Sequence, residues 1–238
     1  NAMLAHMAVN ESFIDSAQLR SSVVSASKLL GYIPRSYSSS KVQLDGVFDI
    51  PVDGRSSAPT IFNMTRRSIF STTYNETPFS FVVLDDNIPL TKVGNTYVTD
   101  SNTPIIAYEG RIVKHRLTSN ASDDSHRYEI PDENIDISTL KVRIYDSSSS
   151  VDGTATEFTQ VNLSQVNKES TVYFLNENTF GNYEITFGNG VFGQKLIGGN
   201  IIELEYLITK GEIANGANSD FTYIPTSGPS TYVGSQIS

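Results

Sequence analysis

Short stretches in which apolar and polar residues alternate, separated by turn signals, recur along most of this chain. In the clearest of them, Leu140, Val142 and Ile144 alternate with more polar residues. A period of two residues is typical of a β-strand that buries one face. Turn signals return about every 8–12 residues, and no stretch of ~30 residues has the strand–helix–strand pattern of a parallel sheet. The sequence predicts a mainly β (α+β) fold, in which an N-terminal helical piece precedes one or more antiparallel β domains.

Composition narrows the classes of function. The 238 residues carry a formal net charge of -9 and include no cysteine. An acidic chain repels the phosphate backbone, so we expect no nucleic-acid partner. The absence of cysteine removes disulfides, thiolate metal sites and cysteine nucleophiles. No apolar run approaches the ~20 residues that cross a bilayer, so we expect no membrane partner. The way the chain starts and stops indicates a segment of a longer protein.

Changes in pattern along the chain predict four segments. Residues 1–33 form a helical segment, 34–110 a first β region, 111–224 a second β region with an FGNG hairpin, and 225–238 an extended tail. A polar connector follows the helical segment, and the alternating strands begin after it.

An apolar stripe marks the helical segment as a possible interface. Leu19, Val23, Ala26 and Leu30 fall at i, i+4, i+7 and i+11, which places them on one face of a helix. With Phe13, these residues predict a surface that docks on its own domain or is presented to another chain. Both alternatives stay open. We take Phe13, Leu19, Val23 and Leu30 as the possible interface residues.

The glycines at Gly188, Gly190 and Gly193 spell G-x-G-x-x-G, the pattern of dinucleotide-binding enzymes. That pattern requires a helix directly after the glycines, because its N-terminal amides hold the pyrophosphate. Here two adjacent glycines and an asparagine, residues 198–200, follow before a helix can form. The sequence instead predicts a tight hairpin between antiparallel strands, with Asn189 and Gly190 in the turn. We therefore expect no cofactor.

Other chemistry has little support in the residues. The three histidines, His6, His115 and His126, have no partners at the spacing of a known metal or catalytic motif. The acidic stretch 123–126 imitates a metal cluster, but a polar loop accounts for its composition. We expect no catalytic residue, no metal site and no small-molecule substrate, so that the chain is not an enzyme.

The C-terminal third carries a recognisable motif: a tyrosine, F-G-N-G, a further glycine, G-N, a strand ending in tyrosine, and a closing G-x-x-A-N-G. Its residues here are Tyr183, Phe187, Gly188, Asn189, Gly190, Gly193, Gly199, Asn200, Tyr206, Gly211, Asn215 and Gly216. This motif resembles that of the baseplate J-like wedge proteins of contractile-tailed phages. Two further stretches, around residues 10–36 and 108–147, resemble the T-even branch of that family.

The resemblance implies a structural role. Members of this family assemble as two copies in each wedge, contact other baseplate wedge proteins and form a ring that rearranges when the sheath contracts. It implies a place in the tail baseplate of the virion after assembly in the host cytoplasm, and neither catalysis nor a cofactor. The alternative is a carbohydrate- or receptor-binding β module of a tail fibre or adhesin, for which the 12 tyrosines would supply stacking surfaces.

Overall fold

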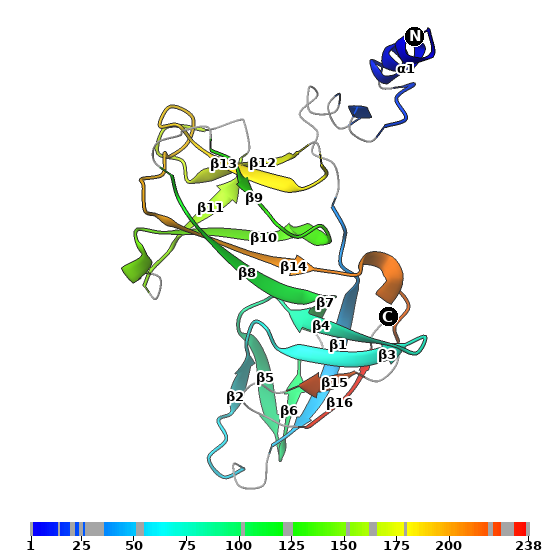
Figure 1. The fold of residues 1–238 in the computed structure, drawn as a ribbon. Helices are drawn as coiled ribbons and strands as arrows, with labels where there is room; N and C mark the ends of the chain where they lie inside the picture. Colours follow the sequence, from blue (N-terminus) through cyan, green and yellow to red (C-terminus); the bar gives the residue numbers. More distant parts are fainter. Residues whose placement is uncertain are drawn as a thin grey trace. The chain divides into compact units, whose positions relative to one another are not determined.

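The computed structural model describes residues 2–13, 15–19, 22–23, 26, 36–50, 55–100, 103–120, 126–150, 153–161, 166–178, 180–218, 221–224 and 231–236. Strands joined by turns and short loops dominate these residues (Figure 1). The predicted mainly β fold is confirmed. No helix in the described part of the chain is long and apolar enough to span a membrane.

Two compact units make up the chain, and each is discontinuous in sequence. Unit 1 comprises Asn1–Ser36, Lys114–Glu133 and Thr139–Tyr206. Unit 2 comprises Tyr37–Val113, Asn134–Ser138 and Leu207–Ser238. The four continuous segments that the sequence indicates stay a prediction. The two compact units divide the chain differently, since each is assembled from three separate stretches.

Unit 2 is built around an antiparallel sheet. Among the described residues it holds nine strands in the order β15-β3-β4-β7-β1-β6-β5-β2, with β16 paired to β1. The strands are β1 (Lys41–Asp49), β2 (Ile61–Met64), β3 (Ile69–Tyr74), β4 (Thr77–Val83), β5 (Ile88–Val93), β6 (Thr96–Thr99), β7 (Ile105–Glu109), β15 (Thr222–Ile224) and β16 (Thr231–Gln236). A short 3-10 helix, η3 (Gly211–Ala214), precedes β15.

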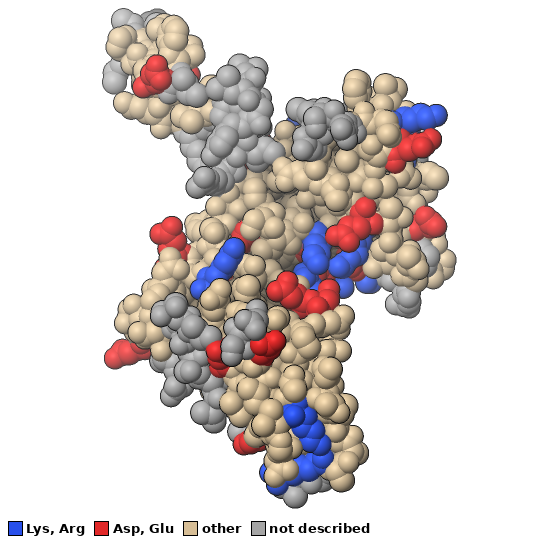
Figure 2. All heavy atoms as spheres, turned by 180° about the vertical axis from the view of Figure 1, so that it is seen from behind, with Lys and Arg blue, Asp and Glu red and all other residues tan. Residues whose placement is uncertain are grey.

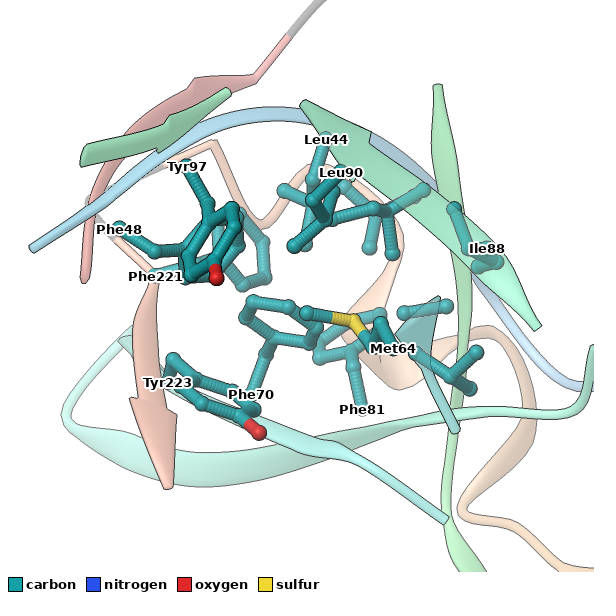
Figure 3. Close-up of a cluster of buried hydrophobic side chains, with 14 of the residues drawn as sticks. Leu44, Phe48, Met64, Phe70, Phe81, Ile88, Leu90, Tyr97, Phe221 and Tyr223 are labelled. Atoms are coloured by element: carbon teal, nitrogen blue, oxygen red, sulfur yellow. The ribbon is translucent and has the colours of Figure 1, made fainter. Parts of the chain in front are cut away.

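Aromatic and aliphatic side chains from most of these strands form the core of unit 2. Figure 3 shows Phe48, Phe70 and Phe81 pointing toward one another with aliphatic residues beside them. The ring of Phe81 meets that of Phe221 edge to face, with centroids 5.3 Å apart. Such aromatic pairs add to the stabilisation that burial alone provides.

The spacing of Phe79, Phe81 and Val83 in the sequence predicts one buried face for β4, and all three side chains are buried. Gly46 interrupts the apolar alternation of residues 41–49 and predicts a bulge or turn there, but that prediction is wrong. β1 runs without interruption, with a burial pattern that alternates through this glycine. The amide of Gly46 donates to the hydroxyl of Thr99 at 3.0 Å, so the backbone stays extended and hydrogen-bonded there.

A second sheet carries most of unit 1. Among the described residues it has seven strands in the order β8-β14-β10-β11-β12-β13-β9. They are β8 (Arg111–Thr118), β9 (Tyr128–Glu129), β10 (Ile135–Tyr145), β11 (Thr156–Gln160), β12 (Val172–Glu177), β13 (Tyr183–Phe187) and β14 (Ile201–Ile208). β11 and β12 pair in parallel, unlike the antiparallel neighbours β10–β11 and β12–β13. The 3-10 turn η2 (Ser148–Ser150) follows β10.

The predicted FGNG hairpin is wrong. β13 pairs with β12 and β9, whereas the next strand along the chain, β14, lies between β8 and β10. Three strands separate β13 from β14 in the sheet. Residues 188–200 therefore form a connection to a distant position in the same sheet. We call these residues the motif loop.

In the described residues the N-terminal helical piece is interrupted after Glu11. Helix α1 (Ala2–Glu11) ends before the apolar stripe begins. The carboxylate of Glu11 then accepts hydrogen bonds from the amides of Gln18 and Leu19, at 3.0 and 3.2 Å from the nearer oxygen. Leu19 lies at a bend, and Val23 is helical. The stripe therefore does not belong to one continuous helix in the described residues.

Candidate interaction surface

The motif residues do not converge on one site. Those from Tyr183 to Tyr206 belong to unit 1, whereas Gly211, Asn215 and Gly216 belong to unit 2. The asparagines of the motif form hydrogen bonds that hold the chain near them. The geometry is that of a structural motif shared between two units.

Within the motif loop, two glycines touch. A Cβ atom on Gly188 would lie 2.2 Å from the carbonyl carbon of Gly193 and 2.3 Å from its oxygen. Gly190 and Gly193 have φ angles of 84° and 82°, in the region that favours glycine. The Gly190 amide donates to the Gly193 carbonyl at 3.1 Å. The glycine spacing therefore serves a compact reversal inside the loop.

Asn189 stabilises this reversal through its side chain. Its Oδ1 accepts hydrogen bonds from the amides of Val191 and Phe192, each at 3.0 Å. This is the local side-chain-to-backbone bonding that makes asparagine frequent in turns. The amide of Gly193 in turn donates to the carbonyl of Asn167 at 3.0 Å. The loop is thus tied to the segment that precedes β12.

Asn200 fixes the far end of the motif loop. It is buried, and its Oδ1 accepts from the amide of Ile197 at 2.7 Å. Its Nδ2 donates to the carbonyl of Asp146 at 3.1 Å, and its own carbonyl accepts from the amide of Ser119 at 2.8 Å. Asn200 therefore joins the loop to the end of β10 through its side chain and to the end of β8 through its backbone carbonyl, satisfying backbone groups that burial would otherwise leave unpaired.

The tyrosines of the motif lie inside unit 1. Tyr206 is buried, and its hydroxyl donates to Oδ2 of Asp132 at 2.6 Å. Tyr183 is also buried, and its carbonyl accepts from the amide of Ile130 at 2.8 Å. Both tyrosines place a large ring in the core, and the Tyr206 hydroxyl is satisfied there by its hydrogen bond to Asp132.

The closing part of the motif shapes the entry to β15 in unit 2. Gly211 and Gly216 have φ angles of 71° and 94°. The hydroxyl of Ser40 donates to Oδ1 of Asn215 at 2.7 Å. A Cβ on Gly216 would lie 2.9 Å from the hydroxyl of Tyr74. These residues hold the chain where it leaves η3.

The motif loop also exposes large apolar side chains. Val191 is 66% exposed, Phe192 63% and Ile197 74%. Because the hydrogen bonds of Asn189 and Asn200 order the loop, these side chains are presented on a fixed backbone. On the face shown in Figure 2, most of the visible surface is uncharged, and basic side chains stand in small groups. Ordered apolar side chains on such a surface are typical of protein contact sites.

The interface residues predicted in the helical segment are also at the surface. Phe13 is 63% exposed, Leu19 54% and Val23 37%. Leu30 lies outside the described residues. The three described side chains do not belong to the buried core of unit 1.

A buried group of charges in unit 1 was not anticipated. Both Glu203 and Glu205 lie within β14, with side chains 0% and 3% exposed. Arg116 holds Glu203 through Nη2 at 2.7 Å and Nε at 2.9 Å, and Lys114 lies 3.3 Å from the same carboxylate. Nη1 of Arg143 lies 3.5 Å from Glu203 and 3.7 Å from Glu205. We call these five residues the charge cluster.

The charge cluster favours the ionised form of Glu203. Burial on its own would raise the pKa of Glu203, but hydrogen bonds from Arg116 and Lys114, and their charges, lower that pKa below its ordinary value of 4.5. The sequence carries one signal for this cluster: acidic residues alternate along β14, and basic residues alternate along β8 and β10. Opposite charges on neighbouring strands attract each other. The cluster joins β14 to β8 and β10.

No group of three or more potential metal-binding side chains gathers in the part of the chain that the structure describes. Residues 123–125 of the acidic stretch lie outside that part. The ring of His126 packs against the ring of Tyr128, with centroids 4.6 Å apart. The arrangement that stands out chemically is therefore the ordered apolar loop.

Comparison with known proteins finds a similarity to a phage protein. No family model matches the sequence. The chain is similar to the "Baseplate wedge protein gp6" of Enterobacteria phage T4, with 30% identity over 235 residues. The similarity covers 92% of this chain and 33% of the relative, so the chain spans about a third of that protein's length. The similarity supports a baseplate wedge-like protein.

Proposed function

We propose that this chain is a structural segment of a baseplate wedge in a contractile phage tail. In this role it joins wedge proteins into a ring and takes part in the shape change that triggers sheath contraction. The observation that carries the proposal is the similarity to the T4 wedge protein along nearly the whole chain. The motif residues support it, because they stabilise loops and the core instead of forming a reaction centre.

The proposal includes partners and place. The partners are a second copy of the protein and other baseplate wedge proteins, and the place is the tail baseplate of the virion, reached after assembly in the host cytoplasm. We propose no enzymatic activity and no cofactor. A T4 protein named for the baseplate wedge is the basis for each of these assignments.

The motif loop is our proposed contact surface. Full burial of a side chain of this size contributes roughly 1.5–3 kcal/mol. With Val191, Phe192 and Ile197 each about two-thirds exposed, a partner that covers all three gains on the order of 3–6 kcal/mol. Association costs roughly 4–15 kcal/mol in lost freedom of motion. One loop therefore gives at most a weak contact, which suits an assembly held by many contacts at once.

The test replaces the three apolar side chains together, as Val191→Ser, Phe192→Ser and Ile197→Ser. We expect the variant protein to keep its fold, as measured by circular dichroism, and to associate more weakly with itself or with purified wedge proteins in sedimentation velocity. A control variant changes exposed apolar residues elsewhere, Val93→Ser and Ile213→Ser, which are 60% and 67% exposed.

Two outcomes would count against the proposal. If the unchanged protein shows no association with itself or other wedge proteins at high concentration, the structural role loses its support. If it associates and the triple variant associates equally well, the motif loop is not the contact surface. Electron microscopy of particles that carry the triple variant would then show complete baseplates.

A further inference from the structure

A surface pocket of about 280 Å³ lies in unit 2, where the chain leaves β7 and β14 beside the start of β4. It is lined by nine residues, of which the charged ones are Glu109, Arg111 and Lys210. None of these three residues belongs to the glycine-rich motif between Tyr183 and Gly216. The pocket is smaller than most sites for cofactors and drug-sized ligands, which occupy roughly 300–1,000 Å³.

The backbone around the pocket is tightly fixed. Gly110 lies between Glu109, the last residue of β7, and Arg111, the first residue of β8, and has a φ angle of 131°. A Cβ on Gly110 would lie 2.3 Å from the carbonyl oxygen of Ile208 and 2.5 Å from a methyl group of Leu207. Only glycine permits this contact, so the backbone on either side of it has a defined course.

A carboxylate lies at the base of the pocket. Glu109 is only 3% exposed, and its Oε2 accepts hydrogen bonds from the hydroxyl of Thr209 at 2.6 Å and the amide of Lys210 at 2.9 Å. Its other oxygen, Oε1, accepts no hydrogen bond from the described residues. Oε1 is not fully buried, and Glu109 lines the pocket, so a ligand in the pocket can reach this oxygen.

Two positive charges lie at the rim. Arg111 and Lys210 are exposed and form no ion pair with the described residues. The Nζ of Lys210 lies 3.5 Å from the carbonyl of Pro78 and 4.9 Å from the ring centre of Phe79. With Glu109, the lining carries two positive charges and one negative charge. A local excess of positive charge is notable in a chain whose net charge is -9.

We propose that this pocket binds an acidic peptide segment, an Asp or Glu side chain with its adjoining main chain, from a partner protein. Arg111 and Lys210 hold the ligand carboxylate, and Oε1 of Glu109 accepts an N–H from the ligand main chain. One carboxylate brings the lining to zero net charge, and charge-assisted hydrogen bonds of this kind are the stronger ones. This inference deepens the proposed function and rests on it only for the source of the peptide.

The experiment follows the backbone amide signals of the nitrogen-15-labelled chain by NMR during titration with N-acetyl-glutamate N-methylamide. We expect shifts at Gly110, Arg111 and Lys210. The neutral analogue N-acetyl-glutamine N-methylamide binds about tenfold more weakly, because it lacks the charge that Arg111 and Lys210 recognise. Acetate, which lacks the N–H groups, is also weaker.

Matched variants separate the pocket from a general charge effect. The double variant Arg111→Gln and Lys210→Gln abolishes the shifts and keeps the remaining spectrum. Lys168→Gln, which removes an exposed charge in unit 1, leaves the titration unchanged.

Four results would each overturn the inference: no shift with the glutamate compound, equal binding of the glutamine compound, equal binding of acetate, or tighter binding of N-acetyl-lysine N-methylamide. The last result would indicate a basic ligand on Glu109. Since the titration involves only this pocket, its failure leaves the association test of the motif loop unaffected.

Discussion

Replacing Glu203 by glutamine tests whether the charge cluster stabilises the protein. The substitution preserves shape and removes one charge, so it leaves no cavity. The buried side chain then presents an amide to Arg116, Lys114 and Arg143, which are all donors. At least one of these hydrogen bonds loses its acceptor or its charge.

The expected loss follows from the contacts. A hydrogen bond to a charged group contributes roughly 1.5–3 kcal/mol, and removing one partner of a buried pair costs about 3–5 kcal/mol. The cations here are not fully buried, because the side chains of Arg116 and Lys114 are 50% and 36% exposed and regain water. We therefore expect Glu203→Gln to lower the free energy of unfolding by about 2–3 kcal/mol near neutral pH.

Urea denaturation at several pH values provides the assay. Because the pKa of Glu203 is lowered in the folded protein, its carboxylate stabilises the fold above the unfolded pKa, near 4.5. That stabilisation is lost as the pH falls through the lower folded value. The difference between the original protein and the variant should thus be constant above about pH 5 and shrink below about pH 4.5.

The matched control is Glu169→Gln, whose side chain is 83% exposed and lies 4.0 Å from Lys168. An exposed pair of this kind contributes less than about 1 kcal/mol. If Glu203→Gln is no more destabilising than Glu169→Gln, or if its effect does not depend on pH, the cluster does not stabilise the fold as argued.

Three further substitutions test the interior of unit 1. Gly188→Ala should cost about 2 kcal/mol or more in urea denaturation, because the new Cβ overlaps the Gly193 backbone; a loss below ~0.5 kcal/mol would contradict the contact. Tyr206→Phe should cost about 1–2 kcal/mol by removing the hydrogen bond to Asp132, and an unchanged midpoint would refute that. Burial raises the pKa of Tyr173 from 10.0 to about 12, so stability should fall between these pH values by up to roughly 2–3 kcal/mol, and Tyr173→Phe should remove that fall.

Local patterns predicted the parts of the fold that depend on local contacts. The alternation of Phe79, Phe81 and Val83 placed one face of β4 correctly, because successive residues of a strand point to opposite faces. The sequence Asp85-Asp86-Asn87 is typical of a turn, and these residues do connect β4 to β5, with Asn87 at a φ angle of 63°.

Features that depend on distant segments were not predicted. The sequence predicts a hairpin after β13 because consecutive strands often pair, but the motif loop connects β13 to β14, with three other strands between them in the sheet. The burial of Glu203 depends on bases in β8 and β10 that lie 60 to 89 residues earlier in the chain. The candidate pocket could not be predicted, because the fold brings Lys210 to the same pocket as the distant residues Glu109 and Arg111.

The interleaved order of the two units has a consequence for how the protein is made. A ribosome releases residues in sequence, so Lys114–Glu133 and Thr139–Tyr206 emerge while the sheet of unit 2 still lacks β15 and β16. β1 must wait for Thr231–Gln236 to supply one of its partners. Pairing between segments so far apart slows folding and leaves strand edges uncovered for longer. Unit 2, which begins to emerge before most of unit 1, is therefore completed only after the last residues of unit 1 have left the ribosome.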